Sequence, residues 1–248
     1  MLDRLNDVLW VHLGHAYGSA KDVPVLIRSL LAEDADTRSE AIHELFGNIW
    51  HQGTVYEATA HAVPFLFEVV EARALPEINE VLVLLALIAR GRGYYQVHDP
   101  SRTTETEKEA RSVASAREAV RSGIPIAIAL LHDHDRSVRL TAAHLLAVFA
   151  DDARSLHALE RALASEADAY ARTCLGLALA CVGKLSDDVF QDSPSCALPV
   201  ARLRELARMT VAQSVRLDDC LDILLDAAVH ELEPGLLDDL GVPELSQR

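Results

Sequence analysis

The chain has 248 residues; half are hydrophobic, only 5% are aromatic, and 38 acidic side chains stand against 23 basic ones. The formal net charge of −15 disfavours binding to nucleic acid or to an anionic membrane surface, because both carry negative charge. Alternating β-branched or aromatic runs are nearly absent, so the sequence predicts an all-α fold with almost no strand.

The start of the chain, its apolar runs and its cysteines predict the cellular compartment of the protein. No basic segment followed by an apolar stretch opens the chain, and the longest apolar run, 81–89, is too short to cross a bilayer. The four cysteines form no CxxC motif, and Cys174 and Cys181 are two helical turns apart, too far for a disulfide along one helix. We therefore expect a cytoplasmic protein with buried, reduced thiols and no cofactor.

The first predicted element is a helix over residues 1–21 that caps an array of helices. Leu5, Leu9 and Leu13 recur at helical spacing and would form one apolar stripe. The stripe would pack on the first repeat of the array.

Residues 22–90 are expected to form repeats 1 and 2, each a pair of helices joined by a short turn. Pro24 fits the first turn of a helix, where its missing N–H costs nothing, and Asp22 is the expected cap. The equivalent proline of the second repeat is Pro64, so the spacing is not strict.

Residues 91–123 interrupt the pattern. Gly91 and Gly93 predict a loop, and the polar stretch 105–121 predicts a mostly exposed helix. We expect an inserted loop and helix that project from one face of the array. A flexible linker between two half-arrays would have the same composition, and this alternative stays open.

Residues 124–185 are expected to form repeats 3 and 4, and residues 197–240 a degenerate C-terminal repeat. Three segments, 24–49, 125–149 and 158–182, can be laid over one another, each with an Asp four residues before an Arg. These pairs are Asp34 and Arg38, Asp135 and Arg139, and Asp168 and Arg172. The Asp can cap the second helix, and the Arg can pair with an Asp of the adjacent repeat. A recurring helix pair of this period predicts an α-solenoid.

The repeats resemble HEAT repeats of the short bacterial type. The residues that carry the resemblance in the clearest copy are Pro125, Leu130, Leu131, Asp135, Val138, Arg139, Ala142, Ala143 and Leu146. The resemblance implies one right-handed α-solenoid of about five HEAT-like helical hairpins over residues 1–248. It implies little about activity, since HEAT arrays include scaffolds, inhibitors and a few enzymes.

Enzyme families with this fold resemble the chain less well. Deoxyhypusine hydroxylases hold two irons with His-Glu dyads repeated on successive helices, and here His43-Glu44 lacks an equivalent in the third and fourth repeats. HEAT-like alkylpurine DNA glycosylases need a basic concave surface, which the net charge of −15 opposes. The sequence therefore favours a protein that is not an enzyme, and it predicts no catalytic residue.

The connector at 48–57 differs from an ordinary spacer between helices. It concentrates aromatic, imidazole and amide side chains where small polar residues are usual, and such side chains are frequent at binding hot spots. We expect them to meet side chains of the opening segment at one end of the array. The predicted partner- or ligand-binding residues are Asn48, Trp50, His51, Gln52, Tyr56, Glu57, His12, His15 and Tyr17.

Two interpretations of this connector stay open. Trp50 can fill the gap where the repeat lengthens, while His51 and Glu57 satisfy buried backbone groups; alternatively, the same groups line a pocket. The spacing of the histidines matches no metal motif, so no metal site is predicted.

Architecture and charge together predict a non-catalytic scaffold that binds a protein partner on one face of the solenoid. The negative charge favours a basic partner, and an immunity or inhibitor protein against a basic toxin domain is one instance. The alternative is an enzyme or small-molecule-binding protein that uses the connector from Trp50 to Glu57. Neither nucleic acid nor a membrane is an expected partner, and the sequence does not predict the oligomeric state.

Overall fold

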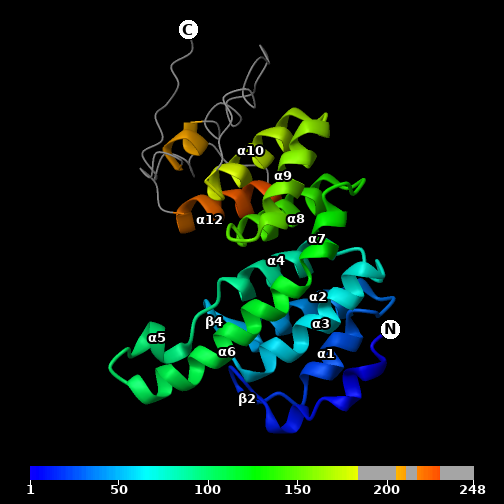
Figure 1. Cartoon of the computed structure of the whole chain (residues 1–248). Helices are drawn as coiled ribbons and strands as arrows, with labels where there is room; N and C mark the ends of the chain where they lie inside the picture. The colour runs from blue at the N-terminus through cyan, green and yellow to red at the C-terminus, as the bar shows by residue number, and fades with distance from the viewer. Residues whose placement is uncertain (184–204, 211–216, 230–248) are drawn as a thin grey trace. The chain divides into compact units, whose positions relative to one another are not determined.

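The structure is a computed structural model that describes residues 1–183, 205–210 and 217–229 (Figure 1). The described chain is mainly helical, with two short β-hairpins as its only strands. The predicted all-α class is therefore confirmed for this part of the chain. Contacts between Cα atoms divide the protein into two units, Met1–Ile126 and Ala127–Arg248, and each unit is described by itself.

The opening segment does not form the predicted capping helix. It forms, in order, the 3₁₀ helices η1 (Asp3–Asp7) and η2 (Trp10–His12) and a hairpin of strands β1 (Gly14–His15) and β2 (Gly18–Ser19). Gly18, the first residue of β2, has a φ of 123°, which L-residues rarely adopt. The leucine stripe is not buried as a unit, because Leu5 is fully buried whereas Leu9 is 69% exposed.

Residues 22–90 form four helices, with a β-hairpin between the second and the third. The elements are α1 (Val23–Ser29), α2 (Ala35–Asn48), β3 (Trp50–His51), β4 (Thr54–Val55), α3 (Glu57–Glu71) and α4 (Ile78–Ala89). Helix α1 packs on α2, and α3 packs on α4. Gln52 and Gly53, with φ of 48° and 88°, form the two-residue turn between β3 and β4, and this is the backbone that a tight hairpin requires. Thus most of the unusual connector is a β-hairpin.

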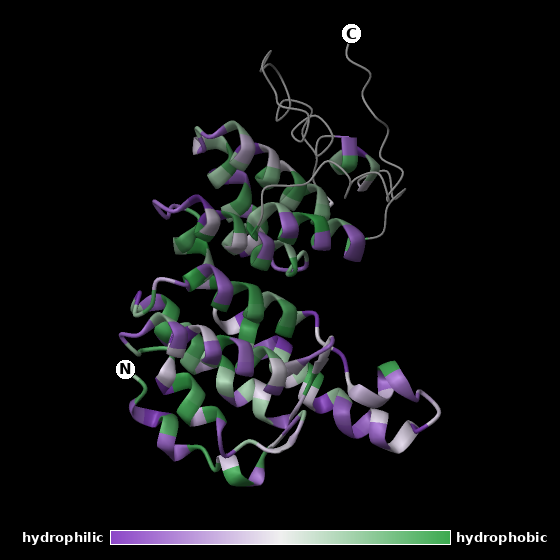
Figure 2. Ribbon diagram, turned by 180° about the vertical axis from the view of Figure 1, so that it is seen from behind, coloured by the Kyte–Doolittle hydropathy of each residue, from purple (hydrophilic) through white to green (hydrophobic). Residues whose placement is uncertain are grey.

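The insertion consists of α5 (Tyr94–His98) and α6 (Thr103–Ser122). The second half of α6 packs on α3 and α4: Ala116 and Val120 are fully buried, and Arg117 Nη1 donates to the carbonyl oxygen of Ala89 at 2.7 Å. This docked half is neither a flexible linker nor a projecting helix. The first half does extend from the other helices of the unit, together with α5, and hydrophilic residues predominate there (Figures 1 and 2).

Unit 2 has a core of leucine and alanine side chains between helices. Its elements are α7 (Ile124–Leu130), which begins at the end of unit 1, α8 (Arg136–Ala147), α9 (Ala153–Ser165), α10 (Ala169–Cys181) and α12 (Leu217–Val229). Helix α8 contacts α9, α10 and α12, and residues 141–149 are all buried. The helices predicted for repeats 3 and 4 are therefore present. Most of the predicted C-terminal repeat, residues 197–240, lies outside the described residues.

The three recurring aspartates each cap the second helix of a helix pair, as predicted. Asp34, Asp135 and Asp168 each accept a hydrogen bond at 2.8 Å from a backbone N–H in the first turn of the helix that follows. A cap of this kind satisfies one of the N–H groups that the start of a helix leaves without a partner. The turn 132–135 with its two histidines is the capped turn of α8.

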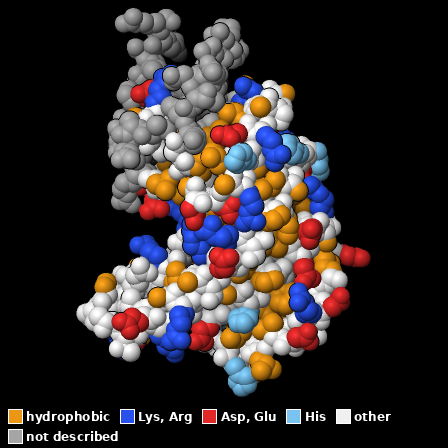
Figure 3. All heavy atoms as spheres, viewed as in Figure 1, with side chains coloured by type: hydrophobic (Ala, Val, Ile, Leu, Met, Phe, Trp, Pro, Cys, Tyr) orange, Lys and Arg blue, Asp and Glu red, His pale blue; other side chains and the backbone are white. Residues whose placement is uncertain are grey.

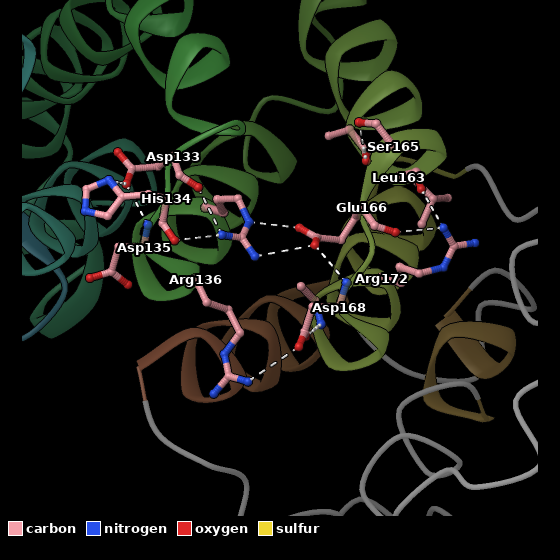
Figure 4. Close-up of polar contacts among 12 residues, drawn as sticks. Asp133, His134, Asp135, Arg136, Leu163, Ser165, Glu166, Asp168 and Arg172 are labelled. Carbon is pink, nitrogen blue, oxygen red and sulfur yellow. Dashed lines mark hydrogen bonds and ion pairs between the residues drawn. The ribbon is translucent and has the colours of Figure 1, made fainter.

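Two of the three recurring arginines connect adjacent pairs of helices, but to a glutamate instead of the predicted aspartate. Arg38 donates from Nε and Nη2 to both carboxylate oxygens of Glu77, at 2.9 and 2.8 Å. Arg139 donates in the same way to Glu166, at 2.8 and 3.4 Å. The third arginine, Arg172, donates to the backbone carbonyl oxygens of Leu163 and Glu166 (Figure 4). An aspartate does take part in one link, since Arg136 lies 3.9 Å from Asp168.

Candidate functional site

A pocket of about 360 Å³ opens in unit 1, beside the β-hairpins and the insertion. It is lined by Gly14, His15, Val55, Tyr56, Glu57, Tyr95, Glu105, Lys108, Glu109 and Ser112. Its walls therefore come from β1, from β4 and the start of α3, from α5, and from the first half of α6. Three lining residues, His15, Tyr56 and Glu57, are among the predicted binding residues.

Carboxylates outnumber basic groups around the pocket. Glu57, Glu105 and Glu109 line it, against Lys108. A hydrogen bond with its own backbone and the bond from Arg102 lower the pKa of Glu105, so this carboxyl is ionised at neutral pH. Arg102 offsets the charge of Glu105, and Lys108 offsets one of the two remaining carboxylates, Glu57 and Glu109, so an excess of one negative charge remains. A pocket of this kind favours a cation over an anion.

Two tyrosine rings line the same pocket. The hydroxyl of Tyr56 is hydrogen-bonded to Thr54 Oγ1 at 2.7 Å, and burial raises the pKa of Tyr56, so the phenol is neutral at pH 7. Tyr95 already shows the contact that a cation can make there, because the guanidinium carbon of Arg102 lies 4.5 Å from the centre of its ring. The faces of such rings attract positive charge.

The insertion fixes the orientation of Glu109. Its Oε2 accepts a hydrogen bond at 2.9 Å from the backbone N–H of Tyr95. Gly93 makes this approach possible, because a Cβ atom there would lie 2.6 Å from the same oxygen. One face of α6 is thus tied to the first turn of α5, and the carboxylate stays at the pocket wall.

A second group of predicted residues meets around Asp22, next to the pocket through His15. Asp22 Oδ2 accepts a hydrogen bond from Asn48 Nδ2, and Asp22 Oδ1 is bonded to His15 Nε2, both at 2.9 Å. The Nδ1 atom of His15 accepts from the backbone N–H of Tyr17 at 3.0 Å, so the ring proton is on Nε2 and points to Asp22. The predicted helix cap at Asp22 is wrong: its carboxylate accepts no hydrogen bond from α1.

Tyr17 extends the contact between the opening segment and the connector. Its ring meets that of His51 edge-on, with 5.4 Å between ring centres, and its hydroxyl lies 3.4 Å from His51 Nδ1. Tyr17 is 70% exposed. The predicted meeting of these two segments is therefore present in the structure.

The remaining predicted residues do not line the pocket. Trp50 is half-buried and packs edge-on against Phe46, with 6.2 Å between ring centres, as the packing interpretation expects. Gln52 is exposed in the turn of the hairpin, and His12 is exposed on η2.

The sequence prediction missed the pocket residues on the insertion, Tyr95, Glu105, Lys108 and Glu109. The acidic and basic residues of 105–121 predict a helix with solvated faces, and nothing in their spacing shows which face meets the connector. The tyrosine pair after Gly93 was the available signal, since neighbouring aromatic residues are unusual in a polar loop.

Exposed apolar side chains lie close to the hairpin β1–β2. Val11, which is 60% exposed, accepts a hydrogen bond on its carbonyl oxygen from Ser19 Oγ of β2, and Leu9 and Tyr17 are also exposed. On the face seen in Figure 3, hydrophobic side chains are interspersed with charged ones. Apolar side chains that are exposed close to one another can contribute to a protein interface.

None of the helices that the structure describes combines the length and the apolar character that a bilayer span requires. Among the described residues, no three His, Cys, Asp or Glu side chains are grouped as metal ligands, and His43 and Glu44 are both exposed on α2.

No protein-family model, curated protein or solved structure gives a significant match to this chain. The function is therefore inferred from the pocket and the surface around it.

Proposed function

We propose that the protein is a non-catalytic binding scaffold, and that the pocket of unit 1 accepts a lysine or arginine side chain of a basic protein partner. The observation that carries the proposal is the excess of carboxylates over basic groups in a pocket that also has two tyrosine rings. Its volume of about 360 Å³ is at the lower end of the range for ligand sites, which suits one long side chain.

The energy available in the pocket favours a protein over a free small cation. Glu57 is exposed and Glu109 is half-buried, and ion pairs near solvent contribute roughly 0.2–1 kcal/mol each. Such pairs give selectivity and speed of association more than affinity. A tight complex therefore needs additional apolar contact, for which Leu9, Val11 and Tyr17 are exposed near the pocket.

The net charge of −15 points to the same class of partner, since opposite net charges accelerate association. A basic toxin domain is one such partner, against which the protein would act as an immunity or inhibitor protein. The proposal includes HEAT-like repeats in a right-handed solenoid of about five hairpins. The recurring Asp caps and hairpin-linking arginines support the repeats.

An array of 15-residue peptides tests the proposal directly. The peptides differ in their number and spacing of Lys and Arg, and matched neutral and acidic peptides are included. We expect the full-length protein to retain basic peptides and to release them as the salt concentration rises, because salt screens exposed charges.

Variants show whether the pocket is responsible. Glu57→Gln together with Glu109→Gln should lose the retention, whereas Glu40→Gln together with Glu71→Gln should keep it. Glu40 and Glu71 are exposed glutamates of the same unit outside the pocket, so both variants change the net charge equally. If both double variants lose retention equally, the net charge of the protein and not the pocket is responsible. If acidic peptides are retained as well as basic ones, the proposal is contradicted.

A small-molecule cation is the second candidate ligand, because the pocket has the dimensions of a ligand site. N-acetyl-lysine methylamide, titrated in an NMR experiment, distinguishes the two candidates. Saturation below about 1 mM would show that one side chain suffices for binding, whereas weaker binding is expected for a protein partner.

A further inference from the structure

Two buried cysteine side chains of unit 2 meet across a pair of helices. Cys181 is the last residue of α10, Cys220 lies in α12, and their Sγ atoms are 3.0 Å apart. The side chains are 6% and 0% exposed. We infer that Cys181 and Cys220 are a modification site, at which a peroxide oxidises both thiols to a disulfide between α10 and α12. This inference is independent of the proposed function in unit 1.

The geometry suits a disulfide. The two residues are on different helices that pack against each other, so the cross-link requires no change within either helix. The sulfur atoms need to approach by about 1 Å to reach the length of an S–S bond. Rotation about the Cα–Cβ bonds of the two side chains can supply a movement of this size.

A second cysteine of α10 provides a contrast within the same helix. Cys174 is fully buried, and burial raises the pKa of its thiol to about 12, so it stays protonated. At Cys220, the hydrogen bond with Cys181 lowers the pKa of the thiol, against the effect of burial. Because the thiolate is the reactive form, Cys220 is expected to react before Cys174.

The reaction balances with one molecule of hydrogen peroxide. The Cys220 thiolate attacks the O–O bond, an S–O bond forms, and the departing hydroxide takes a proton to become water. The Cys181 sulfur then attacks the sulfenic sulfur; the S–S bond forms, the S–O bond breaks, and a second water leaves. The two thiols lose two electrons and two protons in total, and the peroxide is reduced to two molecules of water.

Burial makes the oxidation slow but does not prevent it. A peroxide molecule reaches the pair when the contact between α10 and α12 opens locally, as helices in native proteins do. Once formed, the disulfide closes a loop between residues 181 and 220 and restricts the unfolded chain. We expect the cross-link to raise Tm by roughly 5–10 °C.

The test uses the full-length protein, treated with hydrogen peroxide and then denatured, alkylated and digested. We expect two of the four cysteines to resist alkylation, a mass lower by about 2 Da, and one linked peptide pair containing Cys181 and Cys220. A thiol reductant should reverse both the link and the rise in Tm.

Single variants make the assignment specific. Cys174→Ser and Cys196→Ser should still lose two thiols, whereas Cys181→Ser and Cys220→Ser should lose the link. Even if a variant fails to fold, peptide mapping of the unaltered protein shows which two cysteines are linked. Four alkylated cysteines after prolonged treatment, or a link that contains Cys174 or Cys196, would overturn the inference.

Discussion

At the scale of single residues, the two tryptophans of the chain have different environments. Trp10 is 5% exposed, its Nε1 donates to the carbonyl oxygen of Leu5 at 2.8 Å, and its ring packs against Phe65. Trp50 is half-buried and contacts Phe46 edge-on. Trp10 is thus part of the core of unit 1, while Trp50 retains an exposed surface at the hairpin.

This difference predicts unequal effects on stability. Trp10→Ala should lower the free energy of unfolding by about 3–5 kcal/mol, the usual cost of removing a buried aromatic ring. Trp50→Ala should cost only about 1–2 kcal/mol, because less area and one aromatic contact are lost. Urea unfolding monitored by circular dichroism measures both. Equal losses would make Trp50 a core residue and favour the packing interpretation for the whole connector.

At the scale of helices and hairpins, the docking of the insertion depends on Gly123. A Cβ atom at this position would lie 2.1 Å from Cζ of Phe67 on α3. The end of α6 therefore approaches α3 so closely that only glycine fits. This contact, with the buried Ala116 and Val120, holds the helix that carries Glu105 and Glu109 at the pocket.

Gly123→Ala should weaken this docking. We expect a loss of about 1–3 kcal/mol in unfolding free energy, typical of overpacking in a core, and faster hydrogen exchange along α6. Ser115→Ala, an exposed position on the same helix, is the control and should leave exchange unchanged. Unchanged exchange in Gly123→Ala would show that α6 does not depend on its contact with α3.

The ion pair between Arg38 and Glu77, which links two helix pairs in unit 1, predicts that the stability of the fold depends on pH. The hydrogen bonds from Arg38 lower the pKa of Glu77 below its ordinary value. Because the pKa is lower in the folded state, ionised Glu77 stabilises that state. Its contribution is fully present at pH values above the ordinary glutamate pKa of about 4.3. The stabilisation is lost as the pH falls through the lowered value, when the carboxyl becomes protonated.

The Tm of the parent protein and of Glu77→Gln, measured from pH 7 to pH 3, checks this dependence. We expect the variant to melt lower at pH 7, and the difference to shrink as the pH approaches 3. Glu40→Gln, an exposed position on α2, should show no such convergence. A difference that stays constant with pH would mean that the charge on Glu77 does not contribute.

Much of the helical pattern could be predicted from the sequence, because its signals are local. The caps at Asp34, Asp135 and Asp168 and the extents of the helices depend on residues within one or two turns. The opening segment was predicted wrongly, because the helical spacing of its leucines does not show that residues 14–19 pair as a β-hairpin, in which Gly18 has a φ of 123°. The glutamate partner of Arg38 is 39 residues away, and local patterns do not show such distant contacts.

The candidate site was predictable in part for the same reason. The connector was conspicuous by its composition, and the structure brings His15, Tyr17, Asn48 and His51 together. The opposite wall, on α5 and α6, depends on how the insertion docks. Docking is set by packing at Gly123, Ala116 and Val120, which the sequence shows only as small or apolar residues in a polar helix.

At the scale of the whole molecule, the charge of −15 and the pocket of unit 1 lead to the same class of partner. Bulk charge attracts a basic protein at long range but distinguishes poorly between partners. The pocket adds a defined position for one cationic side chain, with Glu57 and Glu109 at its wall. Any acidic protein thus provides the attraction, whereas these two carboxylates provide the recognition.

Isothermal titration with the best-retained basic peptide is the most direct test of this recognition. The account predicts that Glu57→Gln with Glu109→Gln raises the Kd roughly tenfold, as the loss of two ion pairs near solvent implies. Glu40→Gln with Glu71→Gln, of the same net charge, should change the Kd by less than about twofold. Equal weakening in the two double variants would contradict a binding pocket and leave only bulk attraction.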